Sequence, residues 1–257
     1  MAQRLTPRHI ALIFAAGLLC QLGLLCQFQT VLSEHYAYRA QQASAKGQFP
    51  TAAAWAQLSL TLNRHQGYAA YFFGLAEARN GRATQAMQLF RRALRTMPHR
   101  AQPLSDLSTC EEKAGNLTGG LASLAEALSI EPLPPDGGTS SARLGRLLFA
   151  QNRWADGIAR FRSVIPDFPQ SRFPFDGLEA GYERVGAWDL AVASAFALLG
   201  SPQRSSRACE RLLQLSQIAE QRPVILAGLQ EIERTLRPND PRRDAIQNVL
   251  KNIAAER

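Results

Sequence analysis

The sequence predicts an all-helical protein in which an N-terminal transmembrane helix leads into a solenoid of repeated helical hairpins, closed by C-terminal capping helices. Three observations support this fold class. The 257 residues are rich in Ala, Leu, Gln and Arg and poor in β-branched residues, which favours helix over strand. Residues 10–32 carry no charged side chain. Gly47, Gly81 and Gly115 follow one another at equal intervals, which indicates an internal repeat.

The uncharged N-terminal stretch is expected to cross a membrane. At 1.5 Å per residue it would form a helix about 34 Å long, enough for a hydrocarbon core of roughly 30 Å. We assign the transmembrane helix to residues 9–32, after a short basic head of residues 1–8. The alternative is a cleaved signal peptide. It is less favoured because the first small-x-small site, Ala43-Ser44-Ala45, lies well downstream of the apolar run.

The charges that flank this stretch suggest its orientation. Arg4 and Arg8 precede it, which favours a cytoplasmic N-terminus and places the rest of the chain across the membrane. The predicted localisation is therefore a single-pass protein of a bacterial inner membrane with its solenoid in the periplasm. Arg39 and Lys46 follow the apolar stretch and reduce the asymmetry, so a solenoid in the cytoplasm remains the alternative.

The clearest repeat spans residues 67–100. Its spaced residues are small, aromatic or turn-forming, namely Gly74, Gly81, Ala86, Phe90, Ala93 and Pro98. Small residues at Gly74 and Ala86 would let two helices approach closely, and Phe90 would fill the space between them. Gly81 would allow a tight turn between the helices, and Pro98 would close the second one.

This pattern resembles the tetratricopeptide repeat (TPR), a helix-turn-helix with a period of about 34 residues. The likeness continues in register through five repeats, at residues 33–66, 67–100, 101–134, 138–171 and 172–205. It implies a TPR-type right-handed α-solenoid over residues 33–205. Residues 206–257 are expected to form further helices that cap the solenoid.

The resemblance also implies a binding groove. In TPR proteins the first helix of each repeat lines the concave face, where partner peptides or helices lie. The corresponding residues here are Tyr68, Tyr71, Leu75, Arg79, Thr109, Arg146, Phe149, Phe173 and Arg184. Aromatic and Arg side chains are enriched at binding hot spots. The alternative is that the aromatic side chains pack between neighbouring repeats, and for Tyr71 and Phe149 both interpretations stay open.

The sequence shows no pattern typical of an enzyme. It has no P-loop, no GxGxxG motif after a strand and no HExxH motif, and no His follows His99. We therefore expect no catalytic residue, no cofactor, no metal site and no small-molecule substrate. The net charge of +8 is spread without a run of five Lys or Arg, so a nucleic-acid partner is not expected either.

The function implied by the resemblance is that of a non-enzymatic, membrane-anchored TPR scaffold. It would mediate protein–protein interaction in the assembly or stabilisation of a membrane or envelope complex. Because the first repeat follows the expected membrane helix directly, the partner is expected to be a protein embedded in the membrane or adjacent to it. The alternative is a permanent structural or accessory subunit of a multi-subunit membrane complex, held through its transmembrane helix.

Overall fold

The computed structural model describes residues 7–133, 135–136, 138–168, 171, 173–200 and 204–255. Within these residues all regular secondary structure is helical, in thirteen α-helices, as the sequence predicts. The chain divides into two compact units, Met1–Ile130 and Glu131–Arg257. They are called the N-terminal unit and the C-terminal unit below.

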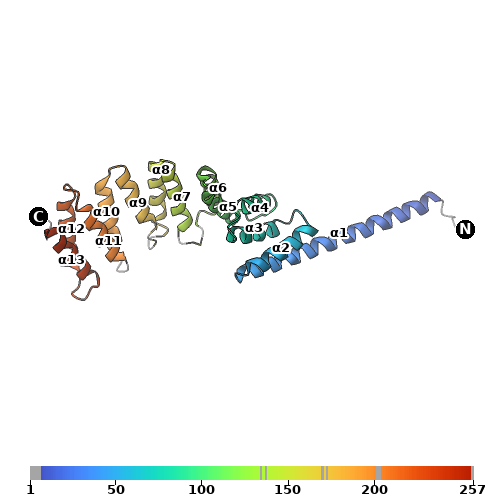
Figure 1. Ribbon diagram of the computed structural model, residues 1–257, viewed down its shortest axis with the longest axis horizontal. Helices are drawn as coiled ribbons and strands as arrows, with labels where there is room; N and C mark the ends of the chain where they lie inside the picture. The colour runs from blue at the N-terminus through green and yellow to red at the C-terminus, as the bar shows by residue number, and fades with distance from the viewer. Residues whose placement is uncertain are drawn as a thin grey trace. The chain divides into compact units, whose positions relative to one another are not determined.

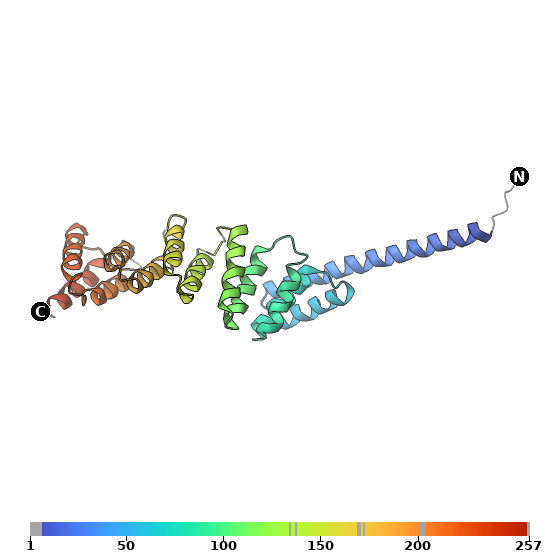
Figure 2. The ribbon, with the colours of Figure 1, turned by 90° about the horizontal axis from the view of Figure 1, so that it is seen from above.

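The N-terminal unit consists of three helical hairpins (Figures 1 and 2). In chain order its helices are α1 (Pro7–Ala45), α2 (Phe49–Leu62), α3 (Gly67–Arg79), α4 (Ala83–Ala93), α5 (Ala101–Lys113) and α6 (Leu117–Ile130). Each odd-numbered helix packs against the helix that follows it, and α2 also packs against α3, as α4 does against α5. This alternation is the packing that a stack of helical hairpins requires.

The C-terminal unit begins with two further hairpins, α7 with α8 and α9 with α10. Its helices are α7 (Thr139–Ala150), α8 (Trp154–Val164), α9 (Phe173–Arg184), α10 (Trp188–Leu199), α11 (Ser205–Leu215), α12 (Arg222–Thr235) and α13 (Arg242–Ala255). After the hairpins, α11 packs against α10 and α13, and α12 packs against α13. These last three helices close the hydrophobic interior of the unit.

The turns inside the hairpins use a left-handed residue at a repeated position. Gly47, Gly81, Gly115 and Gly186 have φ between 72° and 79°. The turn between α7 and α8 has Asn152 at this position, with φ 59°. Asn tolerates this conformation better than other residues that carry a Cβ. Searching for glycine alone therefore misses one turn of the series.

Within a hairpin, a glycine on the first helix faces a phenylalanine on the second. A Cβ added at Gly74 would lie 2.8 Å from Cε1 of Phe90, and one added at Gly145 would lie 2.6 Å from Cε2 of Phe161. Both rings are fully buried, at 0% and 1% exposure. The close approach expected at Gly74 and Phe90 is therefore confirmed, and the hairpin of α7 and α8 repeats it.

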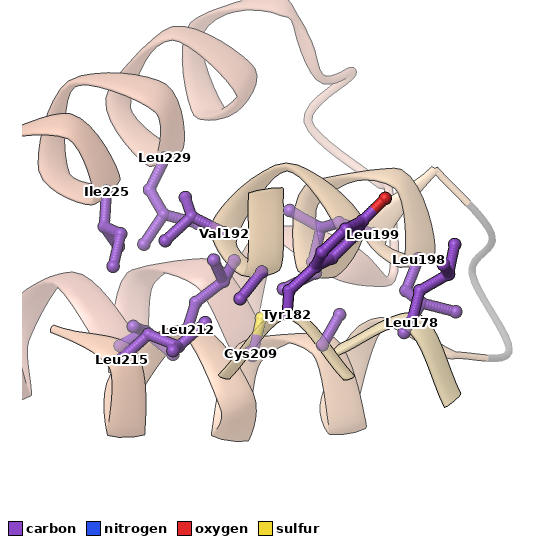
Figure 3. Packing of buried hydrophobic residues seen from close by; sticks show 14 of the residues in the cluster. Leu178, Tyr182, Val192, Leu198, Leu199, Cys209, Leu212, Leu215, Ile225 and Leu229 are labelled. Carbon is purple, nitrogen blue, oxygen red and sulfur yellow. The ribbon is translucent and has the colours of Figure 1, made fainter. Parts of the chain in front are cut away.

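Each unit has its own hydrophobic core. In the N-terminal unit it is built mainly of Ala, with Tyr71, Phe72 and Phe90 as the large members. In the C-terminal unit it extends from α7 to α13. Figure 3 shows part of that core, where Val192, Leu212, Leu215, Ile225 and Leu229 share one interior. Burial of such apolar surface is the main force that holds helical pairs of this kind together.

The predicted transmembrane helix is not supported. Within the described residues no helix is long and apolar enough to cross a membrane. The segment assigned to the span, residues 9–32, is part of the longer helix α1, and Gln21, Gln27 and Gln29 interrupt its apolar sequence. Beyond it the same helix enters a hairpin with α2, where Ser33 Oγ meets Ser59 Oγ at 3.0 Å. The predicted localisation as a single-pass inner-membrane protein, with the solenoid on either side, is therefore wrong. Most of the expected basic head, residues 1–6, lies outside the described residues.

Candidate functional site

Each unit has a hollow beside the first helix of one of its hairpins. In the N-terminal unit it has a volume of about 330 Å³ and is bordered by α1 and α3. Its lining residues are Glu34, Ala37, Tyr38, Gln41, Gln66 and Tyr68. We call this the N-terminal hollow. Four of the six residues come from α1, so this helix forms most of the lining of the hollow.

Two tyrosines dominate the N-terminal hollow. Tyr38 is 56% exposed and Tyr68 is 38% exposed. The Nε2 amide of Gln42 donates a hydrogen bond to the Tyr38 hydroxyl at 2.7 Å, and the side chain of Gln66 accepts one from the Tyr68 backbone at 3.3 Å. An exposed phenol offers an apolar ring together with a hydrogen-bonding hydroxyl, which suits contact with a peptide.

Tyr71 lies one turn further along α3 and has a different role. Its side chain is buried, and its hydroxyl donates to Asp106 Oδ2 on α5 at 2.9 Å. The ring packs at 5.9 Å from that of Phe90. Burial raises the pKa of the Tyr71 hydroxyl, and the negative charge of Asp106 adds to the effect. The bond therefore joins two successive first helices through a phenol that stays protonated.

In the C-terminal unit the hollow is larger and more strongly charged. It has a volume of about 630 Å³, lies between α9 and α11, and is called the C-terminal hollow. Its lining residues are Asp176, Glu179, Ala180, Glu183, Ser206, Arg207, Glu210, Arg211 and Gln214. Four carboxylates therefore face two guanidinium groups. The excess of negative charge favours a ligand that brings cations or hydrogen-bond donors.

An ion-pair network ties the two helices of this hollow together. Arg211 pairs with both Glu179 and Glu183, and Arg207 lies 3.4 Å from Asp176. The Glu179 side chain is only 8% exposed. Burial raises the pKa of Glu179, while the charge of Arg211 and its hydrogen bond oppose that shift. A buried carboxylate of this kind costs free energy to ionise, even when it is paired.

This shift predicts a pH dependence of stability. Because the pKa of Glu179 in the folded chain lies above its ordinary value of 4.5, protonation of this carboxyl favours folding. That contribution is complete below the unfolded-state pKa and is lost as the pH rises through the folded-state pKa. We expect Glu179→Gln, which keeps the neutral form, to gain in free energy of unfolding relative to the unsubstituted chain as the pH rises. Urea unfolding at a series of pH values measures this.

The control is Glu210→Gln, which removes an exposed carboxylate from the same hollow. Its stability should follow the same pH profile as the unsubstituted chain. If Glu179→Gln also follows that profile, or if its free energy of unfolding falls relative to the unsubstituted chain as the pH rises, ionising Glu179 carries no penalty.

The arginines predicted for the groove are exposed. The guanidinium of Arg79 lies 5.2 Å from the ring centre of Phe49, and that of Arg184 lies 5.5 Å from the ring centre of Trp154. Such cation–π contacts at exposed sites hold an arginine in place only weakly. Arg146 is exposed on α7. Of the nine predicted residues, only Tyr68 lines one of the two hollows.

The remaining predicted residues are partly buried. Leu75 and Phe173 pack against the core of their own unit, and Thr109 donates to the backbone oxygen of Ser105 at 3.1 Å. The ring of Phe149 lies 4.9 Å from that of Trp154 and 5.4 Å from that of Phe161. The alternative for Tyr71 and Phe149 was packing between neighbouring repeats. Tyr71 bonds to Asp106 of the next repeat, and a Cβ added at Gly181 on α9 would lie 2.6 Å from Cζ of Phe149, so both side chains contact the next repeat.

Sequence reasoning missed most of the residues that line the hollows. Glu34 and Gln41 stand one full repeat before Tyr68 and Leu75, so the repeat itself contained the signal for them. Both belong to the predicted repeat of residues 33–66, from which the predicted groove took no residue. Arg207, Glu210 and Arg211 fell within the expected capping helices. The hydrophobic pattern does not reveal that α11 lies beside α9.

Comparison with known proteins agrees with this architecture. No family model and no curated protein sequence matches the chain. Among solved structures it is similar to YrrB, a TPR protein with an unusual peptide-binding site, with a TM-score of 0.58 and 18% identity, covering 64% of this chain and 84% of YrrB. It is also similar to PilF of Pseudomonas aeruginosa, with a TM-score of 0.59 and 13% identity over 89% and 99% of the two chains.

A third similar structure is MamA, with a TM-score of 0.60 and 15% identity over 68% of this chain and 94% of MamA. At these identities the likeness concerns the fold and not the ligand. The hairpins, the left-handed residue in each turn, the glycine–phenylalanine contacts and these structural similarities together show that the chain has the TPR fold.

Proposed function

We propose that this protein is a non-enzymatic TPR scaffold that binds a segment of another protein along its first helices and thereby helps to assemble or stabilise a protein complex. One observation carries the proposal. In each unit a hollow beside the first helix of a hairpin is lined mainly by polar side chains that can make hydrogen bonds and ion pairs. A surface of that kind, on a rigid stack of helices, suits an extended or helical peptide.

The two hollows suit different chemical groups. The N-terminal hollow offers the rings and hydroxyls of Tyr38 and Tyr68, which favour apolar and hydrogen-bonding groups. The C-terminal hollow has more carboxylates than guanidinium groups and favours Lys or Arg side chains. Arg79, Arg146 and Arg184 remain proposed contacts on the first helices. YrrB, which has the same fold, is described as having a peptide-binding site.

A second candidate function is that of a subunit held in a complex through the first part of α1. Six large apolar side chains there are 49–65% exposed, namely Leu18, Leu22, Leu24, Leu25, Phe28 and Val31. In both views this part of α1 extends beyond its hairpin with α2 (Figures 1 and 2). Six large apolar side chains exposed on one segment of a helix are typical of a contact with another molecule.

Affinity purification with quantitative mass spectrometry distinguishes the two functions. The bait is the full chain, compared with a variant that carries Tyr68→Ser, Glu210→Lys and Gln214→Lys in the two hollows. We expect the amount of captured protein to fall by roughly tenfold or more with this variant, because one aromatic contact and one carboxylate are lost and two positive charges are added. A control with Glu220→Lys and Gln230→Lys changes exposed residues outside the hollows.

A truncation of residues 1–32 completes the experiment. If the truncated chain keeps its partner and the hollow variant loses it, the first-helix surface is the binding site. If the truncation loses the partner and the hollow variant keeps it, the second candidate function is correct. Equal loss with the control variant would show that general surface charge, and neither site, is responsible.

A further inference from the structure

A groove in the N-terminal unit lies on the side of α3 away from the N-terminal hollow. At about 100° per residue, Phe73 and Glu77 lie about 140° and about 180° around the axis of α3 from Tyr68, which lines the N-terminal hollow. Two adjoining hollows, of about 880 Å³ and about 630 Å³, share Gln57, Phe73 and Arg92. Together they form a groove with α2 on one side, α4 on the other and α3 beneath it. We call it the α2–α4 groove.

The floor of the α2–α4 groove is apolar. Phe73 from α3 lies in both hollows, Leu60 from α2 lines the larger one, and Leu89 from α4 lines the smaller one. All three side chains are only partly buried, so part of each faces the groove. Three apolar side chains from three helices form a place where an aliphatic or aromatic anchor of a ligand gains burial.

The rim of the groove is cationic. Glu77 is the one acidic residue of either lining, and it is 4% exposed and paired with Arg82, whose Nη2 donates to Glu77 Oε1 at 2.8 Å. Two further arginines, Arg64 and Arg92, also line the groove. Among the described ion pairs of this unit, neither is paired with a carboxylate. Two guanidinium groups therefore remain uncompensated beside the apolar floor.

The structure also orients one of these cations. Arg92 Nε donates to the backbone oxygen of Arg64 at 3.0 Å, and Arg92 Nη2 donates to the same oxygen. This contact holds the Arg92 guanidinium between the end of α2 and the side of α4, while Arg64 is exposed. Exposed Gln85 and Gln88 add amide groups along α4. An arginine held in this way needs less ordering when it meets a carboxylate.

We propose that the α2–α4 groove binds an acidic amphipathic segment of a partner protein. The apolar side chains of the segment pack on Leu60, Phe73 and Leu89, and its carboxylates pair with Arg64 and Arg92. Charge complementarity selects the acidic ligand, because a basic segment would meet two unpaired arginines. The groove lies between the second helices α2 and α4, on the side of α3 away from the N-terminal hollow. This proposal therefore does not depend on the proposed function. The scaffold then has two binding surfaces for two different segments.

The test uses the full chain and a display library of random short peptides. We expect selection to enrich peptides that are net acidic and carry apolar residues at i, i+3 or i+4, and i+7. The selected peptides are then measured by fluorescence anisotropy against Gln85→Glu/Gln88→Glu, which adds two negative charges to the groove. Binding should weaken by roughly tenfold or more, because like charges then face each other. Both glutamines are exposed, so the fold should tolerate the change.

The matched control is Gln48→Glu/Gln230→Glu, the same chemical change at exposed residues that line neither the groove nor the two hollows. It should leave the affinity within roughly twofold, because neither added charge faces a ligand in the groove. Arg64→Gln removes one proposed partner and should also weaken binding and reduce its dependence on salt. Enrichment of neutral or basic peptides, an equal loss with the control variant, unchanged binding to Gln85→Glu/Gln88→Glu, or no selected peptide at all would each overturn the proposal.

Discussion

Phe161→Ala is expected to lower the free energy of unfolding of the C-terminal unit by about 3–5 kcal/mol. Phe161 is 1% exposed, and its ring lies against Gly145 on α7 and Gly177 on α9. Neither glycine has a side chain that can move into the space the ring leaves. The variant therefore loses the burial of the ring and keeps most of the cavity. Such a change costs more free energy than one at a site that can collapse around the smaller side chain.

Tryptophan fluorescence during urea unfolding measures this effect in the C-terminal unit alone. Trp154 and Trp188 belong to that unit, and Trp55 belongs to the other, so both chains are compared in a Trp55→Phe background. Leu190→Ala is the control, because Leu190 is 49% exposed on α10. A loss below about 1 kcal/mol for Phe161→Ala, similar to that expected for a surface change, would contradict this account of the packing.

Gly74→Val is the corresponding prediction for the N-terminal unit, expected to cost about 1–3 kcal/mol by overpacking. A Cβ at this position would lie 2.8 Å from Cε1 and 2.9 Å from Cδ1 of Phe90, and 3.3 Å from Cβ of Leu89. Phe90 is fully buried, so its ring has no free space into which to move. Either the ring or the two helices must shift to admit the new side chain.

A double-mutant cycle shows whether the clash with Phe90 is the cause. Phe90→Leu alone should lower the free energy of unfolding. The double variant Gly74→Val/Phe90→Leu should lose less than the sum of the two single losses, by about 1 kcal/mol or more. Gly23→Val makes the same change on α1, where an added Cβ would meet nothing within 4 Å, and so controls for the different helix propensities of Gly and Val. Trp55 reports the unfolding of this unit when Trp154 and Trp188 are replaced by Phe. Strict additivity of the two changes would refute direct contact as the reason for glycine at this position.

The fold follows from local sequence signals to a large extent. The regular repeat predicts the hairpins, because each needs a close helix contact and a tight turn, and these two requirements restrict residue types at fixed positions. Gly74, Phe90 and Gly81 show both requirements in one hairpin. The turn at Asn152 escapes a search for glycine, since the requirement is a left-handed conformation and not a particular residue.

The prediction of a single-pass membrane protein was wrong. Residues 9–32 were judged by their lack of charge, yet within the described residues no helix meets the length and hydropathy that a membrane span needs. The same helix continues to Ala45, where Ser33, Ala37 and Ala40 are buried in the N-terminal unit. Charge and composition do not show where a helix stops, because helix boundaries depend on what the helix packs against.

The candidate site depended on tertiary structure more than the fold did. A single TPR pattern distinguishes the first helix of a hairpin from the second, but it does not show which side chains reach a neighbour. Tyr71 and Phe149 occupy groove positions in the pattern, and both turn out to pack between helices. Glu179 occupies the position at which α3 and α7 have a glycine, and it pairs with Arg211 on a helix outside its own hairpin.

The sequence by itself therefore determined the helical hairpins, their period and their turns, because these depend on backbone conformation and on contacts between residues close in the chain. Only the tertiary structure decided which surfaces are hollow, which charges are compensated, and that residues 9–32 and the first helix of repeat 33–66 form one continuous helix, α1. Those properties depend on pairs of residues far apart in the sequence, such as Tyr71 with Asp106 and Glu179 with Arg211. No local pattern records such pairs, since they exist only after neighbouring helices have packed.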